Sequence, residues 1–237
     1  MSDRKHDLSV EVNAPKEAVW DALTIPSEIV KWFAPIAEVQ PGVGGKIELG
    51  WSEDMKGPNE ILEWAPSEKL TLAMGERRVE FTITGEGGTT TLRLVHSGFS
   101  ADSSFDDEFE STRGGWLTYF TILRYGLDRH RGVPAENVTV LGSIQEPRDS
   151  VWPRVEKPSQ ALGRETREMA QPAPGYMVVS IPDLNDSLVA VFCELAGPST
   201  YVSYSAYLFG DARRHAADVR ERLNQAVNAV CSPSAVG

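Results

Sequence analysis

The chain has 237 residues, of which 41% are hydrophobic and 24% charged, a composition typical of a globular protein. Its net charge of −11 is concentrated in residues 1–137, which hold 14 Lys and Arg against 23 Asp and Glu. Because such an acidic surface repels phosphate groups, the composition argues against nucleic acid and anionic membranes as partners.

The sequence shows no signal for export, membrane insertion or metal binding. No apolar run approaches the roughly 20 residues that cross a bilayer, and the first residues lack the apolar core of a secretory signal. The two cysteines, Cys193 and Cys231, have neither metal-ligand spacing nor the pattern of a disulfide framework. We therefore expect a cytoplasmic protein with no metal and no cofactor.

A short sequence motif that occurs twice predicts two related domains. Pro15–Trp20 and Pro147–Trp152 each combine a proline, a charged pair and Val-Trp, and each follows a β-leaning stretch. Their offset of 132 residues is far longer than a solenoid repeat. We expect one domain at residues 1–134 and a shortened, related domain at residues 138–237.

The first domain is expected to open with a strand and two short helices and to continue as an antiparallel meander with one apolar face. Alternation places Leu62 and Trp64 on one face of a strand, and Gly85–Gly88 predicts a hairpin turn. An acidic loop should precede a long helix with an aromatic stripe. The expected segments are strands at 8–12, 47–51, 62–64, 70–74, 79–83 and 92–94, helices at 16–24, 26–33 and 116–131, and a loop at 100–113.

The second domain is expected to contain fewer strands. A polar stretch at 156–174 reads as a weak helix plus loop. The expected strands lie at 138–144, 176–181, 188–195 and 201–209, followed by a helix at 211–230. Its sheet edge should be covered by the first domain or by a second chain, so the domain is either a structural partner of the first or a dimerisation module.

Several motifs in order along the first domain resemble the START-like superfamily, and within it the branch named after the activator of Hsp90 ATPase. They cover residues 8–132. The motifs are Val12-Asn13-Ala14-Pro15 with Val19-Trp20, Trp32-Phe33, Gly44-Gly45-Lys46, Glu60-Ile61-Leu62-Glu63 with Pro66 and Leu70, Leu94-Val95-His96-Ser97-Gly98-Phe99, and the Gly114-Gly115-Trp116 helix.

The resemblance implies an α+β helix-grip fold, in which a curved antiparallel sheet surrounds a long C-terminal helix. It also implies a deep cavity between sheet and helix. Members of such families bind lipids, hormones or polyketides, cyclise polyketides, or sequester small molecules, and some act as co-chaperones. No catalytic set is shared across the superfamily, so the resemblance assigns none here.

Two groups of residues are candidates for the site. His96 continues the apolar alternation of Leu92 and Leu94, and Glu60 shares a parity with Leu62 and Trp64, so the pair could act as general acid and base. Both residues also have a purely structural reading. The residues expected to line the cavity are Trp32, Trp51, Glu60, Trp64, Phe81, His96, Trp116, Tyr119 and Phe120.

Three functions follow as hypotheses. The first is binding of a small hydrophobic molecule, aromatic or polycyclic, in the first domain. The second is a cyclase or hydrolase using Glu60 and His96, and the third is a protein-interaction role like that of the Hsp90 activators. Asp106-Asp107-Glu108 could belong to a lid hinged at Gly114-Gly115, or simply to a solvated loop. A homodimer is also considered.

Overall fold

The computed structural model describes residues 4–196 and 199–232. The strands are β1 (Arg4–Val12), β2 (Ile36–Gln40), β3 (Lys46–Gly50), β4 (Lys56–Ala65), β5 (Lys69–Met74), β6 (Arg77–Glu86), β7 (Thr89–Phe99), β8 (Ala135–Ile144), β9 (Arg167–Ala170), β10 (Tyr176–Ile181), β11 (Ser187–Ala196) and β12 (Ser199–Phe209). The α-helices are α1 (Lys16–Thr24), α2 (Pro26–Ile29), α3 (Asp106–Arg129), α4 (Arg148–Val151), α5 (Pro158–Leu162) and α6 (Ala216–Cys231), and short 3-10 helices lie at Ser103–Phe105, Trp152–Arg154, Pro182–Leu184 and Gly210–His215.

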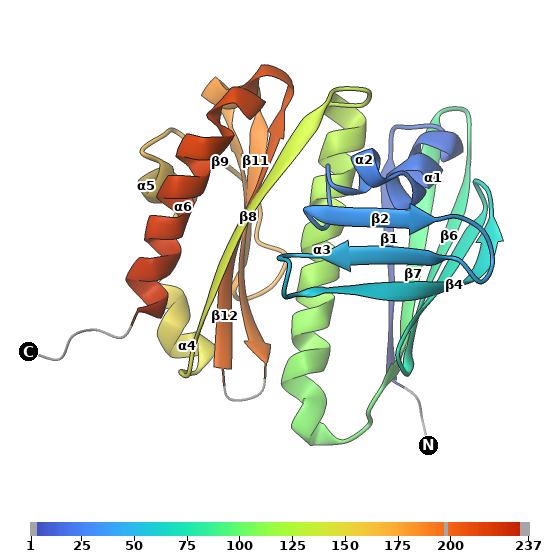
Figure 1. Ribbon diagram of the computed structural model, residues 1–237, viewed down its shortest axis with the longest axis horizontal. Coiled ribbons are helices and arrows are strands. Elements are labelled where there is room, and N and C mark those ends of the chain that lie inside the picture. The colour runs from blue at the N-terminus through green and yellow to red at the C-terminus, as the bar shows by residue number, and fades with distance from the viewer. Residues whose placement is uncertain (1–3, 197–198, 233–237) are drawn as a thin grey trace, which may run out of the picture. The chain divides into compact units, whose positions relative to one another are not determined.

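The chain forms two compact units, each with its own antiparallel sheet (Figure 1). The first unit comprises residues 1–105 and 119–132, and the second comprises residues 106–118 and 133–237. Helix α3 therefore contributes its first half to the second unit and its second half to the first. The α+β class is confirmed, whereas the domain boundaries at 134 and 138 stay a prediction.

The first unit contains a seven-stranded sheet in the order β1-β7-β6-β5-β4-β3-β2. Its alternating apolar residues point to one side, as the sequence predicts: Phe81 and Ile83 in β6 and Leu92 and Leu94 in β7 are buried. The hairpin turn between β6 and β7 lies at Gly87–Gly88. This unit has the sheet and long-helix elements of a helix-grip fold.

Strand β4 departs from the predicted pattern. Ile61 is fully buried, whereas Leu62 is 36% exposed, so the expectation that Leu62 faces inward is wrong. A bulge interrupts the pairing with β5 between Ile61 and Glu63. Because a bulge inserts an unpaired residue, the alternation of faces does not carry across it. Strand β2, which the sequence did not predict, pairs with β3 at the sheet edge.

Helix α3 begins ten residues earlier than predicted. Asp106, Asp107 and Glu108 form its first turn, where negative charge is favoured by the helix dipole. Gly114 and Gly115 lie inside the helix rather than before it, so the expected acidic loop and its glycine hinge are wrong for residues 106–115. The lid hypothesis loses its structural basis in this segment.

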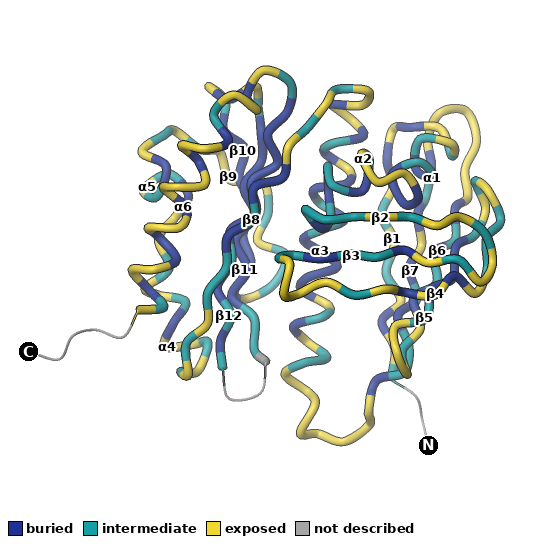
Figure 2. Tube along the Cα trace, in the orientation of Figure 1, coloured by how far each residue is buried: buried dark blue, intermediate teal, exposed yellow. Residues whose placement is uncertain are grey.

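The second unit contains a five-stranded sheet in the order β8-β12-β11-β10-β9. Strand β10 is buried along its whole length, and Figure 2 shows the same dark colour along much of β11. One face of the sheet packs against α6 through Val219, Leu223 and Val227. Strand β9 replaces part of the predicted helix and loop at 156–174, because this segment pairs with β10.

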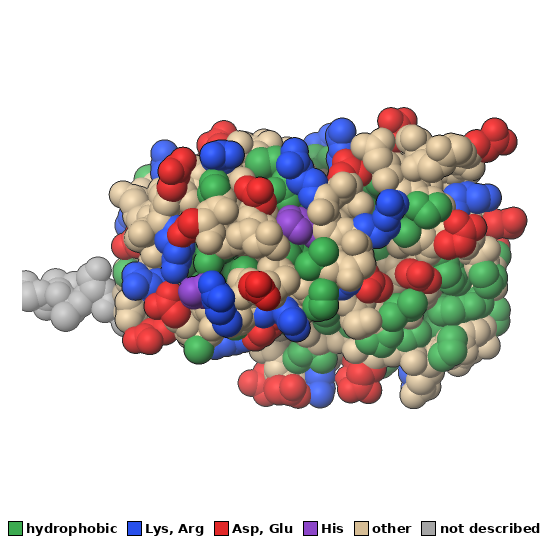
Figure 3. All heavy atoms as spheres, turned by 90° about the horizontal axis from the view of Figure 1, so that it is seen from above, with side chains coloured by type: hydrophobic (Ala, Val, Ile, Leu, Met, Phe, Trp, Pro, Cys, Tyr) green, Lys and Arg blue, Asp and Glu red, His purple; other side chains and the backbone are tan. Residues whose placement is uncertain are grey.

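Charges of both signs are interspersed on the face that Figure 3 shows, with apolar side chains between them. In the described part of the chain, no helix has the length and apolar character needed to cross a membrane.

Candidate functional site

Four aromatic side chains of the first unit form a contact cluster, which we call the aromatic cluster: Trp32, Phe33, Trp51 and Tyr119. The Phe33 ring lies 4.5 Å from the Tyr119 ring and 5.5 Å from the Trp51 ring, both edge-on. Trp32 stacks on Phe33 at 5.1 Å and meets Tyr119 edge-on at 6.5 Å. Such pairs stabilise one another beyond the surface they bury.

Hydrogen bonds fix the orientation of two of these rings. The Trp32 indole N–H donates to the Ala22 carbonyl oxygen in α1 at 2.8 Å, which ties the turn after α2 to the preceding helix. The Trp51 indole N–H donates to the Tyr119 hydroxyl oxygen at 2.8 Å, which joins the end of β3 to α3. The cluster is therefore rigid on two sides before any ligand binds, a property that lowers the entropic cost of binding.

The aromatic cluster contains one buried ring and three half-buried rings. Trp32 is 3% exposed, whereas Phe33, Trp51 and Tyr119 keep part of their surface accessible. Three predicted residues, Trp32, Trp51 and Tyr119, are thus brought together. Phe33 was missed as a site residue, although its place next to Trp32 in the Trp-Phe doublet was a usable signal.

The other predicted aromatic residues lie elsewhere. Trp64 packs edge-on against Trp20 of α1, with ring centres 4.9 Å apart. Phe81 and Phe120 are buried and belong to the core of the first unit. Trp116 is buried in the half of α3 that belongs to the second unit. Their assignment to a ligand site stays a prediction.

His96 is buried in a second group of the first unit. It is the strand partner of His6, and both imidazole rings contact Phe99, at 4.6 Å from His96 and 5.1 Å from His6. The Arg77 guanidinium lies over the Phe99 ring, 4.6 Å from its centre. Burial, helped by the charges of Arg77 and His6, lowers the pKa of His96 to about 4. At neutral pH the imidazole is therefore uncharged.

Glu60 does not face the interior. Its side chain is exposed, while the neighbouring Asn59 is buried and its amide donates to the Ile47 carbonyl oxygen at 3.0 Å. The predicted inward orientation of Glu60 is wrong because the shared parity with Trp64 is broken by the bulge in β4. A buried pair of Glu60 carboxyl and His96 imidazole is therefore not supported by this arrangement.

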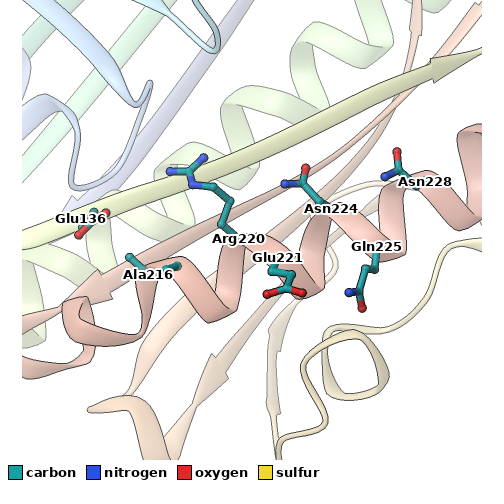
Figure 4. A pocket seen from close by; sticks show the side chains of 8 residues that line it. Glu136, Ala216, Arg220, Glu221, Asn224, Gln225 and Asn228 are labelled. Atoms are coloured by element: carbon teal, nitrogen blue, oxygen red, sulfur yellow. The ribbon is translucent and has the colours of Figure 1, made fainter.

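An open groove of about 580 Å³ runs along α6 in the second unit (Figure 4). Most of its lining residues are polar by type, although the surface that they present to the groove is mainly apolar. The lining residues are Glu136, Ala216, Ala217, Arg220, Glu221, Asn224, Gln225 and Asn228. The predicted cavity belongs to the first unit, so this groove does not test it.

The described residues contain no group of three or more His, Cys, Asp or Glu side chains placed to hold a metal ion.

Residues 13–127 match the family model described as activator of Hsp90 ATPase homolog 1-like protein. The match covers 115 of the 237 residues, and in this segment the chain is similar to that family. The resemblance read from the sequence is confirmed for the first unit, within the START-like superfamily. Whether the second unit is a related copy stays a prediction. No curated protein matches the sequence.

Solved structures with a similar arrangement include two that match about half of the chain. MLL2253 from Mesorhizobium loti is 26% identical over 53% of this chain and 98% of its own, with a TM-score of 0.47. CalU16 from Micromonospora echinospora is 25% identical over 52% of this chain and 73% of its own, with a TM-score of 0.42. DynU16, from the dynemicin biosynthetic locus, is 18% identical over 97% of this chain and 98% of its own, with a TM-score of 0.47.

Proposed function

We propose that the first unit binds a small hydrophobic molecule that carries an aromatic ring. The similarity to this family and the helix-grip elements support a ligand-binding or cyclase-like role in general terms. The observation that carries the finer proposal is the aromatic cluster, in which Phe33, Trp51 and Tyr119 are ordered yet keep accessible surface. Ordered aromatic rings with one accessible side are the usual walls of a site for a flat apolar ligand.

Binding is the better supported of the two roles in this unit. The proposed acid–base pair lacks its carboxylate, because Glu60 is exposed. The neutral His96 imidazole can still exchange a hydrogen bond with a buried polar group, but its low pKa makes it a weak base at neutral pH. The interaction role of Hsp90 activators remains a hypothesis that rests on the family resemblance alone.

Replacing Trp51 by leucine tests the binding site. We expect Trp51→Leu to weaken binding of the dye 8-anilinonaphthalene-1-sulfonate about fivefold, because one aromatic contact is worth about 1 kcal/mol beyond its buried area. Affinity is measured by titrating dye fluorescence, and competitors of fused-ring and straight-chain type then define the ligand class.

Trp64→Leu is the matched control. Trp64 of β4 is also a half-buried tryptophan of the first unit, but it contacts Trp20 rather than the aromatic cluster. Equal loss of dye affinity in both variants, with both still folded by circular dichroism, would contradict the proposed location.

A further inference from the structure

A buried polar contact in the second unit joins α3 to the sheet. The Tyr176 hydroxyl, at the start of β10, lies 2.6 Å from the Ser111 carbonyl oxygen of α3 and 3.1 Å from Glu194 Oε1 of β11. Tyr176 is 1% exposed. The Ser111 hydroxyl is buried and has no hydrogen-bond partner among the described residues, so Ser111 joins this contact through its carbonyl.

The helix is shaped to allow this contact. A Cβ atom at Gly114 would lie 2.4 Å from the Tyr176 ring, and one at Gly115 would lie 3.3 Å from Glu194 Oε1. Glycine is unfavourable in a helix interior, so the pair lowers the intrinsic stability of α3. The two glycines let the sheet approach the helix at the point where Tyr176, Ser111 and Glu194 meet.

The number of protons decides how these three groups can bond. The Tyr176 hydroxyl has one proton to donate, and the Ser111 carbonyl oxygen can only accept. If Tyr176 donates to Ser111, its contact with Glu194 is a hydrogen bond only when the carboxyl carries a proton and donates to the tyrosine oxygen. The shorter distance to Ser111 fits this neutral arrangement.

Ionisation of the Glu194 carboxyl changes which group accepts the hydrogen bond from the Tyr176 hydroxyl. A hydroxyl bonds more strongly to a carboxylate than to a neutral carbonyl, so the tyrosine proton would turn toward Glu194. The Ser111 carbonyl then loses its bond to the sheet. We propose that Glu194, Tyr176 and Ser111 form a proton-controlled latch that holds the first half of α3 on the second sheet when the Glu194 carboxyl is neutral and loosens it when the carboxyl ionises.

The surroundings of Glu194 place the ionisation of its carboxyl near neutral pH. Burial raises the pKa of Glu194 to about 7, and the hydrogen bond with Tyr176 opposes the increase. The neighbouring ionisable or charged groups are Cys193 in β11, Tyr201 opposite on β12 and Arg148 of α4, whose charge acts on Tyr176 and Cys193. On α3, Glu110 and Arg113 are exposed.

Hydrogen–deuterium exchange of the full chain tests the latch. Between pH 6 and pH 8, we expect protection of peptides from residues 106–118 to fall about threefold to tenfold relative to intrinsic exchange rates, the effect of losing one hydrogen bond. Peptides from α6, residues 216–231, should keep their protection. Glu194→Gln, which keeps a neutral donor at this place, should hold the protection of 106–118 high at both pH values.

Two further variants complete the test. Tyr176→Phe removes the hydroxyl and should leave residues 106–118 poorly protected at both pH values, the opposite of Glu194→Gln. Glu168→Gln changes an exposed carboxylate on β9 and should behave as the unaltered protein. The proposal is overturned if protection in the unaltered protein does not change between pH 6 and pH 8, or if Glu194→Gln or Tyr176→Phe follows the unaltered protein.

Discussion

His96 shows how one buried side chain ties stability to pH. The imidazole is 3% exposed and lies beside His6 and the Arg77 charge, so protonation is resisted in the folded chain. In the unfolded chain a histidine takes up a proton near pH 6.5. The folded state therefore binds fewer protons than the unfolded state between pH 6.5 and about 4.

This difference predicts acid destabilisation with a defined window. The contribution of His96 to stability is fully present above pH 6.5 and is lost as the pH falls toward 4, by at most about 3 kcal/mol. His96→Asn should lose less stability than the unaltered protein between pH 7 and pH 4 in urea unfolding. His215→Asn, in the second unit, is the control, and an identical pH profile for all three proteins would refute the role of His96.

Glu194 makes stability depend on pH in the opposite direction to His96. Its pKa is raised, so its favourable contribution is present below the ordinary glutamate pKa and is lost as the pH rises toward 7. His96 in the first unit and Glu194 in the second thus respond to acid in opposite ways: acidification weakens the first unit through His96, whereas protonation of Glu194 stabilises the second.

Helix α3 contains two residues whose intrinsic preference is against a helix. Gly114 and Gly115 lie in its interior, although each costs about 1 kcal/mol relative to alanine. The acidic first turn supports the helix start, and Tyr176 uses the space over Gly114. Packing of Tyr176 over Gly114 and the acidic first turn thus offset part of the low helix propensity of the two glycines.

Gly114→Ala separates helix propensity from packing. Propensity alone predicts stabilisation, but the added Cβ lies 2.4 Å from the Tyr176 ring, so we expect a net loss of about 1–3 kcal/mol. Urea unfolding measures the change. In a Tyr176→Ala background the same substitution should cost much less, and equal costs in both backgrounds would show that the ring is not responsible.

The whole molecule consists of two units that share one helix. Residues 106–118 belong to the second unit and residues 119–132 to the first, so a cut between the domains expected from the sequence separates α3 from half of its partners. The boundary expected at residues 134–138 stays a prediction, and it lies next to the point between residues 132 and 133 where the chain passes from the first unit to the second.

Truncation to residues 1–134 tests this division. The fragment keeps all of α3 but loses the contacts of Ser111 and Gly114 with Tyr176. We expect its residues 106–118 to exchange amide hydrogens at least tenfold faster than in the full chain, while strands β6 and β7 keep their protection. Equal protection of residues 106–118 in both proteins would mean that the first unit alone stabilises the helix.

Sequence patterns alone predicted the class of the fold, the family that residues 13–127 resemble and most of the strands. Alternation in β6 and β7 and the three strands β10, β11 and β12 could be read because each depends on local periodicity. The sequence predicted Trp32, Trp51 and Tyr119 as site residues but did not predict the ring contacts within the aromatic cluster.

The remaining features could not be predicted, because they depend on which distant residues meet in the folded chain. The bulge in β4 turned Glu60 to solvent, and it arises from pairing with β5 rather than from the β4 sequence. Glu194 reads as an ordinary strand residue until folding brings it beside Tyr176, 18 positions away, and Ser111. Burial and proximity, which a linear sequence does not contain, set its charge and hence its role.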